Sequence, residues 1–398
     1  MNFLPNLLFV LLLIFSLYFF INNIYKLIRN IKLGKNINRT DNKKKRFFNM
    51  LSIAFGQSKM VVKPIAGVLH VIVYLGFIII NIELLEIVLD GILGTHRLFA
   101  QYLGRGYNYL IGSFEVLALL VLISVILFWI RRNIIKLERF WKPEMKNWPK
   151  KDADLILYFE VVIMLLFLSM NSVDSILQYN NYPGYIKAGY FPISQFFKPF
   201  FDSFDIYSLF ILERLFWWLH IISILFFLNY LYYSKHLHIL LAFPNTYYAK
   251  LGPKGMFEID DNITKEVKSM MGYDNSNIQN NEIHSKFGAS DIFDLNWVQL
   301  MNSYSCTECG RCTSVCPANL TGKKLSPRKI MMDTRDRLEE VGSNIFKNKG
   351  KFVPDNKELL NDYITKEELW ACTSCNACVE SCPIEIDPLS IIMEMRKY

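Results

Sequence analysis

Five long apolar stretches in the first 240 residues constrain this chain more than any other feature. They cover residues 3–24, 65–89, 112–130, 154–177 and 208–233. A helix needs about 20 mostly apolar residues to cross the hydrocarbon core of a bilayer, and each stretch is close to or above that length. Backbone polar groups inside a membrane must be hydrogen-bonded within the segment, which favours helices. The sequence therefore predicts an all-α protein that begins with a five-helix transmembrane bundle.

The distribution of basic residues predicts how these helices are oriented. The loops after the first and third stretches are rich in Lys and Arg, whereas the other two loops carry few charges. By the positive-inside rule, the N-terminus lies outside and everything after the fifth helix is cytoplasmic. The first stretch lacks a basic leader and a small-residue cleavage site, which favours a retained anchor. We expect a multi-pass protein of a prokaryotic inner membrane. The net charge of +8 is explained by basic residues beside the apolar stretches, which set the membrane topology, and does not indicate nucleic-acid binding.

Three histidines in or beside the predicted spans are candidate haem ligands, because histidine within a membrane marks a functional site by default. His220 and His238 are eighteen residues apart, or five helical turns, so they would share one face at opposite depths. This requires the fifth helix to continue unbroken to near Pro244. His70 lies about one turn inside the cytoplasmic end of the second helix, at the depth of His238. We predict that His70 and His238 bind one haem b iron.

A second haem stays open at this point. No histidine follows His70 at residues 80–81, where a partner for His220 would be expected. His96 is a possible partner, and His70 could pair with His220 instead. The alternative for each histidine, His236 included, is an interhelical hydrogen bond or a place at the membrane interface.

Charged residues in the spans predict a quinone site. Glu83 and Glu86 in the second span, with Glu213 and Arg214 in the fifth, lie toward the outer half of the bilayer under this topology. Quinone chemistry moves protons together with electrons, which carboxylates at this depth would serve. The alternative is a structural ion pair between helices. The loop 179–207, rich in Tyr and Phe, is expected to form an aromatic belt at the outer interface without taking part in chemistry.

All eight cysteines lie in the polar C-terminal part, in two runs of the form C-x2-C-x2-C-x3-C-P. Their density is too low for a disulfide scaffold. The run is typical of bacterial two-cluster ferredoxins, in which the fourth cysteine of one run ligates the cluster of the other. The predicted ligand sets for two 4Fe-4S clusters are Cys306, Cys309 and Cys312 with Cys382, and Cys372, Cys375 and Cys378 with Cys316. Zinc, the competing interpretation, favours cysteine pairs over such quartets.

The predicted domains are residues 1–241 for the membrane part, 242–300 for a polar linker and interaction segment, and 301–398 for the dicluster module. Ser326-Pro327-Arg328 and the stretch to Val341 predict a helix with proline near its start, so the module is expected to be mainly helical. The sequence contains no Gly-rich dinucleotide fingerprint after a strand pattern, no Walker loop and no H-E-x-x-H motif.

The membrane part resembles the five-helix cytochrome b subunits of respiratory nitrate reductase and of membrane-bound heterodisulfide reductase. The resemblance rests on Gly67-Val-Leu-His70, on His220 and on the segment 233–245. It implies one or two haems b and exchange of electrons with a quinone. The second histidine of that family's second helix is missing here, with Ile80 and Asn81 near its place, which puts a second haem in doubt.

The C-terminal module resembles the small iron–sulfur subunit of heterodisulfide reductase, through both cysteine runs, Ser326-Pro327-Arg328 and Trp370-Ala371-Cys372. This implies clusters that pass electrons to a catalytic subunit. The cysteine-rich repeats that hold the catalytic cluster in that family are absent, because all eight cysteines are already assigned. The resemblance therefore implies a substrate site on another polypeptide, a cytoplasmic oxidoreductase subunit with a cysteine-rich domain.

The sequence as a whole favours a membrane electron-transfer subunit that links the quinone pool, haem b and two 4Fe-4S clusters to a separate catalytic subunit. Three alternatives stay open. The first is a haem-free, membrane-anchored ferredoxin, and the second is a redox sensor or assembly scaffold. The third is an ion-translocating redox subunit, for which the intramembrane carboxylates are the only indication.

Overall fold

The computed structural model describes residues 3–253, 255–257, 261–273 and 286–398, and within these ranges the chain is helical with no β-strand. Five helices are long and apolar enough to cross a membrane. They are α1 (Phe3–Ile31), α3 (Pro64–Leu93), α5 (Arg105–Asn133), α6 (Trp148–Tyr179) and α7 (Ile206–Tyr230). The predictions of an all-α chain and of five spans are confirmed. Four helices are longer than their predicted spans, and α7 ends earlier than predicted.

The chain divides into two compact units, each built from two stretches of sequence. The first unit contains residues 1–24 and 60–236, and the second contains residues 25–59 and 237–398. This division differs from the sequence-based one in two ways. Residues 25–59, predicted as a loop of the membrane part, belong with the C-terminal module, and so do the described residues of the predicted linker.

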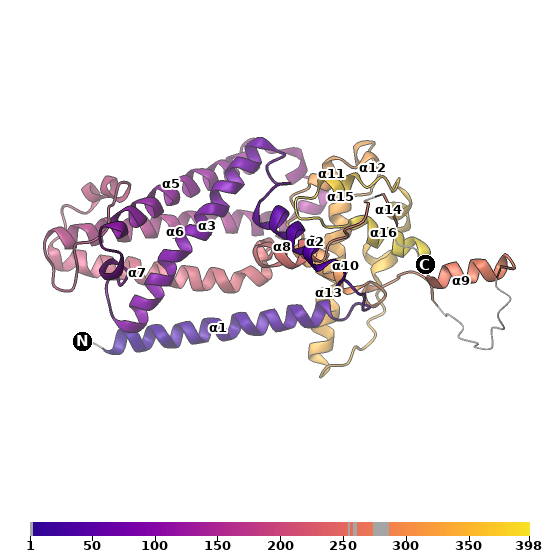
Figure 1. Ribbon diagram of the computed structural model, residues 1–398, viewed down its shortest axis with the longest axis horizontal. Helices are drawn as coiled ribbons and strands as arrows, with labels where there is room; N and C mark the ends of the chain where they lie inside the picture. Colours follow the sequence, from indigo (N-terminus) through magenta and orange to yellow (C-terminus); the bar gives the residue numbers. More distant parts are fainter. Residues whose placement is uncertain (1–2, 254, 258–260, 274–285) are drawn as a thin grey trace. The chain divides into compact units, whose positions relative to one another are not determined.

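The first unit is a bundle in which α3 packs on α5, α5 on α6, and α6 on α7 (Figure 1). Its core is apolar and aromatic, with Tyr107, Ile111, Phe114, Phe167 and Ile221 almost completely buried. The N-terminal part of α1 also belongs to this unit. It joins α7 through polar groups, as the hydroxyl of Ser16 donates to the carbonyl of Leu225 (3.4 Å).

The predicted continuation of the fifth helix to Pro244 is wrong. The helix α7 ends at Tyr230, and Ser234 has an extended backbone (φ −117°, ψ 158°). Buried Asp152 of α6 accounts for the break, because it accepts a hydrogen bond from the Tyr230 hydroxyl (2.6 Å) and another from the Lys235 backbone N–H (3.1 Å). Two short 3-10 helices, Leu231–Tyr233 and Lys235–Leu237, flank the break, and the chain becomes α-helical again only at His238. The five-turn register between His220 and His238 therefore does not exist.

The second unit is formed by short helices around one long helix. Its helices are α2 (Lys43–Met50), α8 (His238–Tyr247), α9 (Asp261–Met270), α10 (Trp297–Ser305), α11 (Arg311–Ser314), α12 (Pro317–Leu320), α13 (Pro327–Lys347), α14 (Lys366–Trp370), α15 (Ala377–Ser381) and α16 (Pro388–Lys397). The prediction of a helix with proline near its start is confirmed by α13, where Pro327 occupies the first turn and the side chain of Ser326 caps the helix.

The segment after residue 24 is an integral part of this second unit. The amide of Asn30 donates to the hydroxyl of Tyr304 on α10 (2.9 Å), and the guanidinium of Arg29 donates to the carbonyl of Gly342 on α13 (2.9 Å). Residue 342 must be small, because a Cβ there would collide with the side chain of Asn30. The end of the first long helix is thereby fixed to the cysteine-bearing module.

Candidate metal centres

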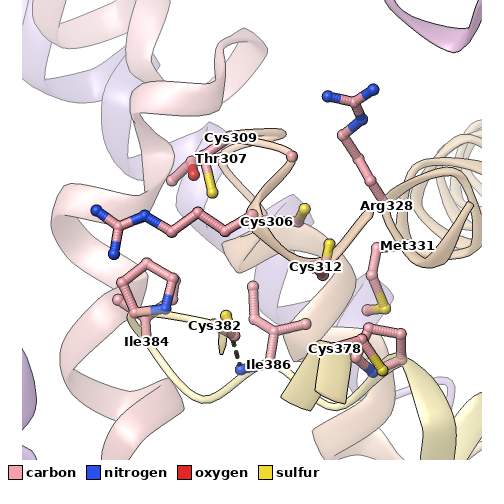
Figure 2. Close-up of a pocket in the computed structure, with 14 residues that line it drawn as sticks. Cys306, Thr307, Cys309, Cys312, Arg328, Met331, Cys378, Cys382, Ile384 and Ile386 are labelled. Carbon is pink, nitrogen blue, oxygen red and sulfur yellow. Dashed lines mark hydrogen bonds between the residues drawn. The ribbon is translucent and has the colours of Figure 1, made fainter. Parts of the chain in front are cut away.

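The eight cysteines line two neighbouring cavities in the second unit. The walls of the first cavity include Cys306, Cys309, Cys312, Cys378 and Cys382, and about 400 Å³ lies between its atoms, counting the part open to solvent (Figure 2). The walls of the second include Cys316, Cys372, Cys375 and Cys378, with about 310 Å³ counted in the same way. Each cavity thus combines three thiols of one run with the fourth thiol of the other run. Among the eight cysteines, Cys378 alone borders both.

The two runs present their thiols through the same backbone conformation. Glu308 and Ser374, each just before the second cysteine of its run, have positive φ angles of 55° and 56°. Gly310 and Asn376, just after that cysteine, are also left-handed, at 71° and 59°. A short helix then begins in each run, α11 in one and α15 in the other. The repeated left-handed residues bend each loop around its cavity, so the two cysteine runs form a structural repeat.

The surroundings of the thiols favour a bound cationic group over free thiolates. Burial raises the pKa of Cys306 to about 11, and the pKa values of Cys378 and Cys382 to about 12. Backbone N–H groups nevertheless point at sulfur, from Ser374 to Cys372 (3.4 Å) and from Ile386 to Cys382 (3.3 Å). A metal that displaces the thiol protons would supply the missing positive charge. The thiol sets and their N–H donors fit two iron–sulfur clusters.

The thiols are spread around the cavities rather than gathered at one point. Across the described ranges, no group of three or more His, Cys, Asp and Glu side chains is arranged to hold a single metal ion. A four-iron cluster is held by four thiolates that do not converge on one ion.

Comparison with known proteins identifies the C-terminal module. A sequence profile described as a 4Fe-4S dicluster domain matches residues 305–386. The chain is 28% identical to the probable iron-sulfur-binding oxidoreductase FadF of Bacillus subtilis, over 98% of this chain and 55% of the relative. It is 26% identical to the EtfAB:quinone oxidoreductase of Syntrophomonas wolfei, over 91% of this chain and 50% of the relative. No solved structure matches significantly.

Shorter relatives match the cysteine module alone. One of them, a component of the ferredoxin/F(420)H(2)-dependent CoB-CoM heterodisulfide reductase of Methanosarcina acetivorans, is 35% identical over 23% of this chain and 44% of its own length. The chain spans about half the length of the two long relatives. Its five apolar helices and its dicluster ferredoxin module make this chain a membrane protein that is similar to iron–sulfur electron-transfer proteins.

The structure places the predicted haem ligands in different elements. His220 lies buried in α7, where its Nδ1 is 3.2 Å from the carbonyl oxygen of Ile163 on α6. His70 is half-buried in α3, and His238 begins α8 in the second unit. The pairing of His70 with His238 stays a prediction. His236 lies 3.9 Å from the carboxylate of Glu160.

His96 does not offer a free nitrogen for a second haem. Its Nε2 is 3.0 Å from Asp174, and its Nδ1 accepts a hydrogen bond from the backbone N–H of Ile186 (3.3 Å). The two contacts occupy both ring nitrogens, which argues against His96 as the partner of His220. His284 lies outside the described residues.

The predicted quinone residues fall into two groups that share no hydrogen bond. Glu213 pairs with its neighbour Arg214 on the same helix (2.6 Å) and accepts a hydrogen bond from the hydroxyl of Tyr185 (2.5 Å), so these two residues form an ion pair within one helix rather than the alternative pair between helices. Both oxygens of Glu86 also accept hydrogen bonds, from the Phe99 N–H and the Tyr107 hydroxyl, each at 2.7 Å.

Glu83 differs from the other three predicted quinone residues. Its side chain is 3% exposed, and its Oε2 makes no hydrogen bond. Its Oε1 is 3.9 Å from Arg97, but that guanidinium is already held by Asp174 (2.6 Å) and Asn171 (2.8 Å). Glu83 is therefore a buried carboxyl group whose ion-pair partner, Arg97, is held more closely by another carboxylate.

Sequence reasoning missed most of this buried polar network. Arg97 and Asp174 form its central ion pair, and Glu115 is completely buried. The backbone N–H groups of Ile193 and Ser194 donate to Glu115 (2.9 and 3.0 Å), so the loop 179–207 does more than form an aromatic belt. A signal was present, because polar residues recur at helical spacing at the end of the fourth apolar stretch and just after it, at positions 171, 174 and 178.

Proposed function

We propose that this chain is a membrane electron-transfer subunit that links the quinone pool to a cytoplasmic oxidoreductase through two 4Fe-4S clusters. The observation that carries the proposal is the reciprocal lining of the two cavities. Cys306, Cys309 and Cys312 with Cys382 hold the first cluster. Cys372, Cys375 and Cys378 with Cys316 hold the second. Clusters held in this way supply one-electron carriers close to each other.

The polypeptide orients the clusters and limits the access of water to them. Apolar side chains wall both cavities, including Met331 and Ile386 in the first and Leu325 and Ile392 in the second. They keep water from the thiolates, which protects metal–sulfur bonds from protonation. The backbone donors at Cys372 and Cys382 stabilise negative charge on sulfur as a site gains an electron.

The partners that we propose for this chain start from the names of its relatives. The Syntrophomonas relative is named for EtfAB and quinone, and we propose that this chain exchanges electrons with a quinone in the same way. We also propose that the clusters exchange electrons with an oxidoreductase subunit that has a cysteine-rich, heterodisulfide-reductase-type domain. The basic loops support a topology with the N-terminus outside and the clusters in the cytoplasm.

A haem b is part of the proposal. The neutral tautomer in which His220 Nδ1–H donates to the Ile163 carbonyl leaves Nε2 with a lone pair, which is the arrangement that axial histidines use. The candidate ligands are His70, His220 and His238, and variants decide which two share the iron. Haem b supplies a one-electron carrier within the bilayer.

Glu83 is the residue we propose for proton exchange at the quinone site. Its Oε2 makes no hydrogen bond, and its long ion pair with Arg97 (3.9 Å) is shared with the closer Asp174 (2.6 Å), so its carboxyl group can take up or release a proton at little cost to the network. The other three predicted residues are engaged in hydrogen bonds or an ion pair and serve to hold the network together.

Two cysteines four residues apart provide the decisive test. Cys312 and Cys316 belong to one run, but they line different cavities. In anaerobically purified full-length protein, Cys312→Ala should remove the electron paramagnetic resonance signal that Cys382→Ala removes. Cys316→Ala should instead remove the signal lost in Cys375→Ala. If Cys312→Ala and Cys316→Ala damage the same cluster, the reciprocal assignment is wrong.

A haem-free, membrane-anchored ferredoxin is the second candidate function. It is favoured by the probable membrane-anchored ferredoxin of Chromohalobacter salexigens, which is 32% identical over 28% of this chain. An optical spectrum of the reduced protein separates the two. Sharp b-type bands that disappear in His70→Ala support the haem-containing subunit, and clusters without such bands support the anchored ferredoxin.

A further inference from the structure

Two buried asparagines in the second unit form an amide pair beside the loop that follows Cys382. Asn245, the last residue of the segment 233–245, lies near the end of α8, and Asn302 lies in α10. They are 0% and 4% exposed, and Nδ2 of Asn302 donates to Oδ1 of Asn245 (3.1 Å). Buried amides with such partners are held in one orientation, and no step of the proposed function uses this pair.

The amide pair contacts the loop at two separate peptide groups. Nδ2 of Asn245 donates to the carbonyl oxygen of Ile384 (2.7 Å). Oδ1 of Asn302 accepts a hydrogen bond from the backbone N–H of Asp387 (2.8 Å). The amide of Asn302 also donates to the carbonyl of Val298 within α10 (2.9 Å), which anchors the pair to that helix. The two asparagines therefore fix the loop on both sides of its middle peptide group.

The middle peptide group points at a cysteine sulfur. Its N–H belongs to Ile386 and donates to Sγ of Cys382 (3.3 Å), as the dashed line in Figure 2 marks. Glu385, on the other side of this peptide group, has a left-handed backbone (φ 61°), which a residue other than glycine adopts only at a cost. Its carboxylate accepts a hydrogen bond from Nδ2 of Asn49 (2.7 Å) and lies 3.2 Å from Nζ of Lys59. The surrounding contacts thus hold the loop in the conformation that aims this N–H at sulfur.

The residues after Cys316, at the same place in the other cysteine run, are arranged differently. They form the helix α12, in which the Leu320 N–H donates to the carbonyl of Cys316 (2.9 Å). The loop after Cys382 contributes Ile384 and Ile386 to the walls of the first cavity, and the walls of the second cavity include neither residue. The amide pair therefore acts at the first cavity.

We infer that Asn245 and Asn302 are positioning residues that raise the reduction potential of the first cluster, because they keep the Ile386 N–H on the sulfur of Cys382. Reduction adds negative charge to the cluster and its thiolates. An N–H donor at sulfur stabilises the reduced form more than the oxidised form. Both asparagines act through the backbone of the loop. The inference rests on the proposed function, which assigns a 4Fe-4S cluster to this cavity.

The test is a potentiometric titration of anaerobically purified full-length protein, followed by electron paramagnetic resonance of each cluster. Cys382→Ala and Cys375→Ala assign the two signals. Asn245→Leu removes the donor to Ile384 and keeps a side chain of similar size. It should lower the equilibrium constant for reduction of the first cluster roughly tenfold, a shift of about 59 mV, without moving the second. Asn302→Leu should shift the first cluster in the same direction.

Three further variants separate positioning from general destabilisation. The double variant with both leucine changes should shift the first potential hardly more than either single change, because the two side chains act as one pair. Asn245→Ser keeps a hydroxyl group and leaves room for a water, so it should shift the potential less than Asn245→Leu. Asn30→Leu is the matched control, because it removes a buried amide that donates to Tyr304 of α10 (2.9 Å). It should leave both potentials unchanged.

Four outcomes overturn the inference. The first two are an unchanged first potential in both leucine variants and an equal shift of both clusters. The third is a shift of the first potential in Asn30→Leu as large as that in Asn245→Leu. The fourth is loss of iron from the first site in every Asn245 and Asn302 variant, which would make the pair a purely structural support. If the wild-type protein holds no clusters, the proposed function itself fails, and that result is distinct from all four.

Discussion

The guanidinium of Arg337 in α13 holds together parts of the dicluster module that are far apart in the sequence. It donates to both oxygens of Asp291 (3.1 and 2.8 Å) and to both oxygens of Asp355 (2.6 and 3.0 Å). It also donates to the carbonyl of Lys357 (2.7 Å). Arg337 is 0% exposed, whereas the side chains of Asp291 and Asp355 keep 13% and 25% exposure.

Replacing Arg337 with Met should destabilise the module substantially. Removing one partner of a buried ion pair costs about 3–5 kcal/mol, because the other charge is left without compensation. Water reaches both carboxylates here, so we expect a loss near the lower end, about 3 kcal/mol. For a unit of about 200 residues, this lowers the melting midpoint by roughly 6–12 °C. The measurement is the thermal loss of visible cluster absorbance in full-length protein in lipid nanodiscs.

An exposed ion pair provides the matched control. Lys324 and Glu367 are also 2.6 Å apart, but their side chains are 69% and 63% exposed. Lys324→Met should therefore move the midpoint by no more than about 2 °C. Equal shifts in Arg337→Met and Lys324→Met would refute the reasoning, since Arg337 is buried and binds two carboxylates, whereas Lys324 is exposed and pairs with one. A midpoint in Arg337→Met within about 1 °C of wild type, on the order of experimental error, would refute it as well.

Three further predictions concern pH, the helix break and the quinone site. The hydrogen bond from Arg337 lowers the pKa of Asp355 below its ordinary value of 3.8. The ionised Asp355 therefore stabilises the fold above that pH, and the stabilisation is lost as the pH falls through the pKa of the folded state. Melting midpoints measured against pH should show this loss at acid pH in the wild type and a weaker loss in Arg337→Met. Asp152→Ala leaves the Lys235 N–H without its acceptor, at a cost of about 1–3 kcal/mol. Hydrogen exchange of the backbone amides across residues 231–237 should therefore become faster. Unchanged exchange would contradict the role of Asp152 in ending α7. Glu83→Gln keeps the side-chain shape but removes the exchangeable proton, so quinol should reduce the clusters about a hundredfold more slowly. Dithionite should reduce them at the wild-type rate, and an unaffected quinol rate would rule Glu83 out.

Local sequence periodicity was enough to predict the membrane helices. Each span is long, apolar and without backbone partners other than its own, so helix is the one available structure in a bilayer. The same reasoning failed at the end of α7. Nothing in the residues 231–237 forbids a helix, and the break depends on Asp152, about eighty positions earlier in the chain. The predicted register of His220 and His238 failed for that reason.

The buried polar network shows a second limit of local reasoning. The sequence singled out Glu83 and Glu86 because charged residues are conspicuous in an apolar stretch. It could not show that Arg97, in a loop outside the predicted spans, supplies the cation that pairs with Asp174. Nor could it show that both carboxylate oxygens of Glu86 accept hydrogen bonds, whereas Oε2 of Glu83 accepts none. Which carboxyl groups remain free depends on the packing of several helices.

The sequence by itself determined the elements with local causes: the five apolar helices, the two cysteine runs, and the proline-started helix at Ser326. These follow from hydropathy, residue spacing and backbone restriction within about twenty residues. Tertiary structure alone decided that the segment 25–59 belongs with the cysteine module, where α7 stops, and that Arg337 joins Asp291 to Asp355. Each of these depends on a hydrogen bond or contact between distant residues, whose energy exists only once the chain has folded.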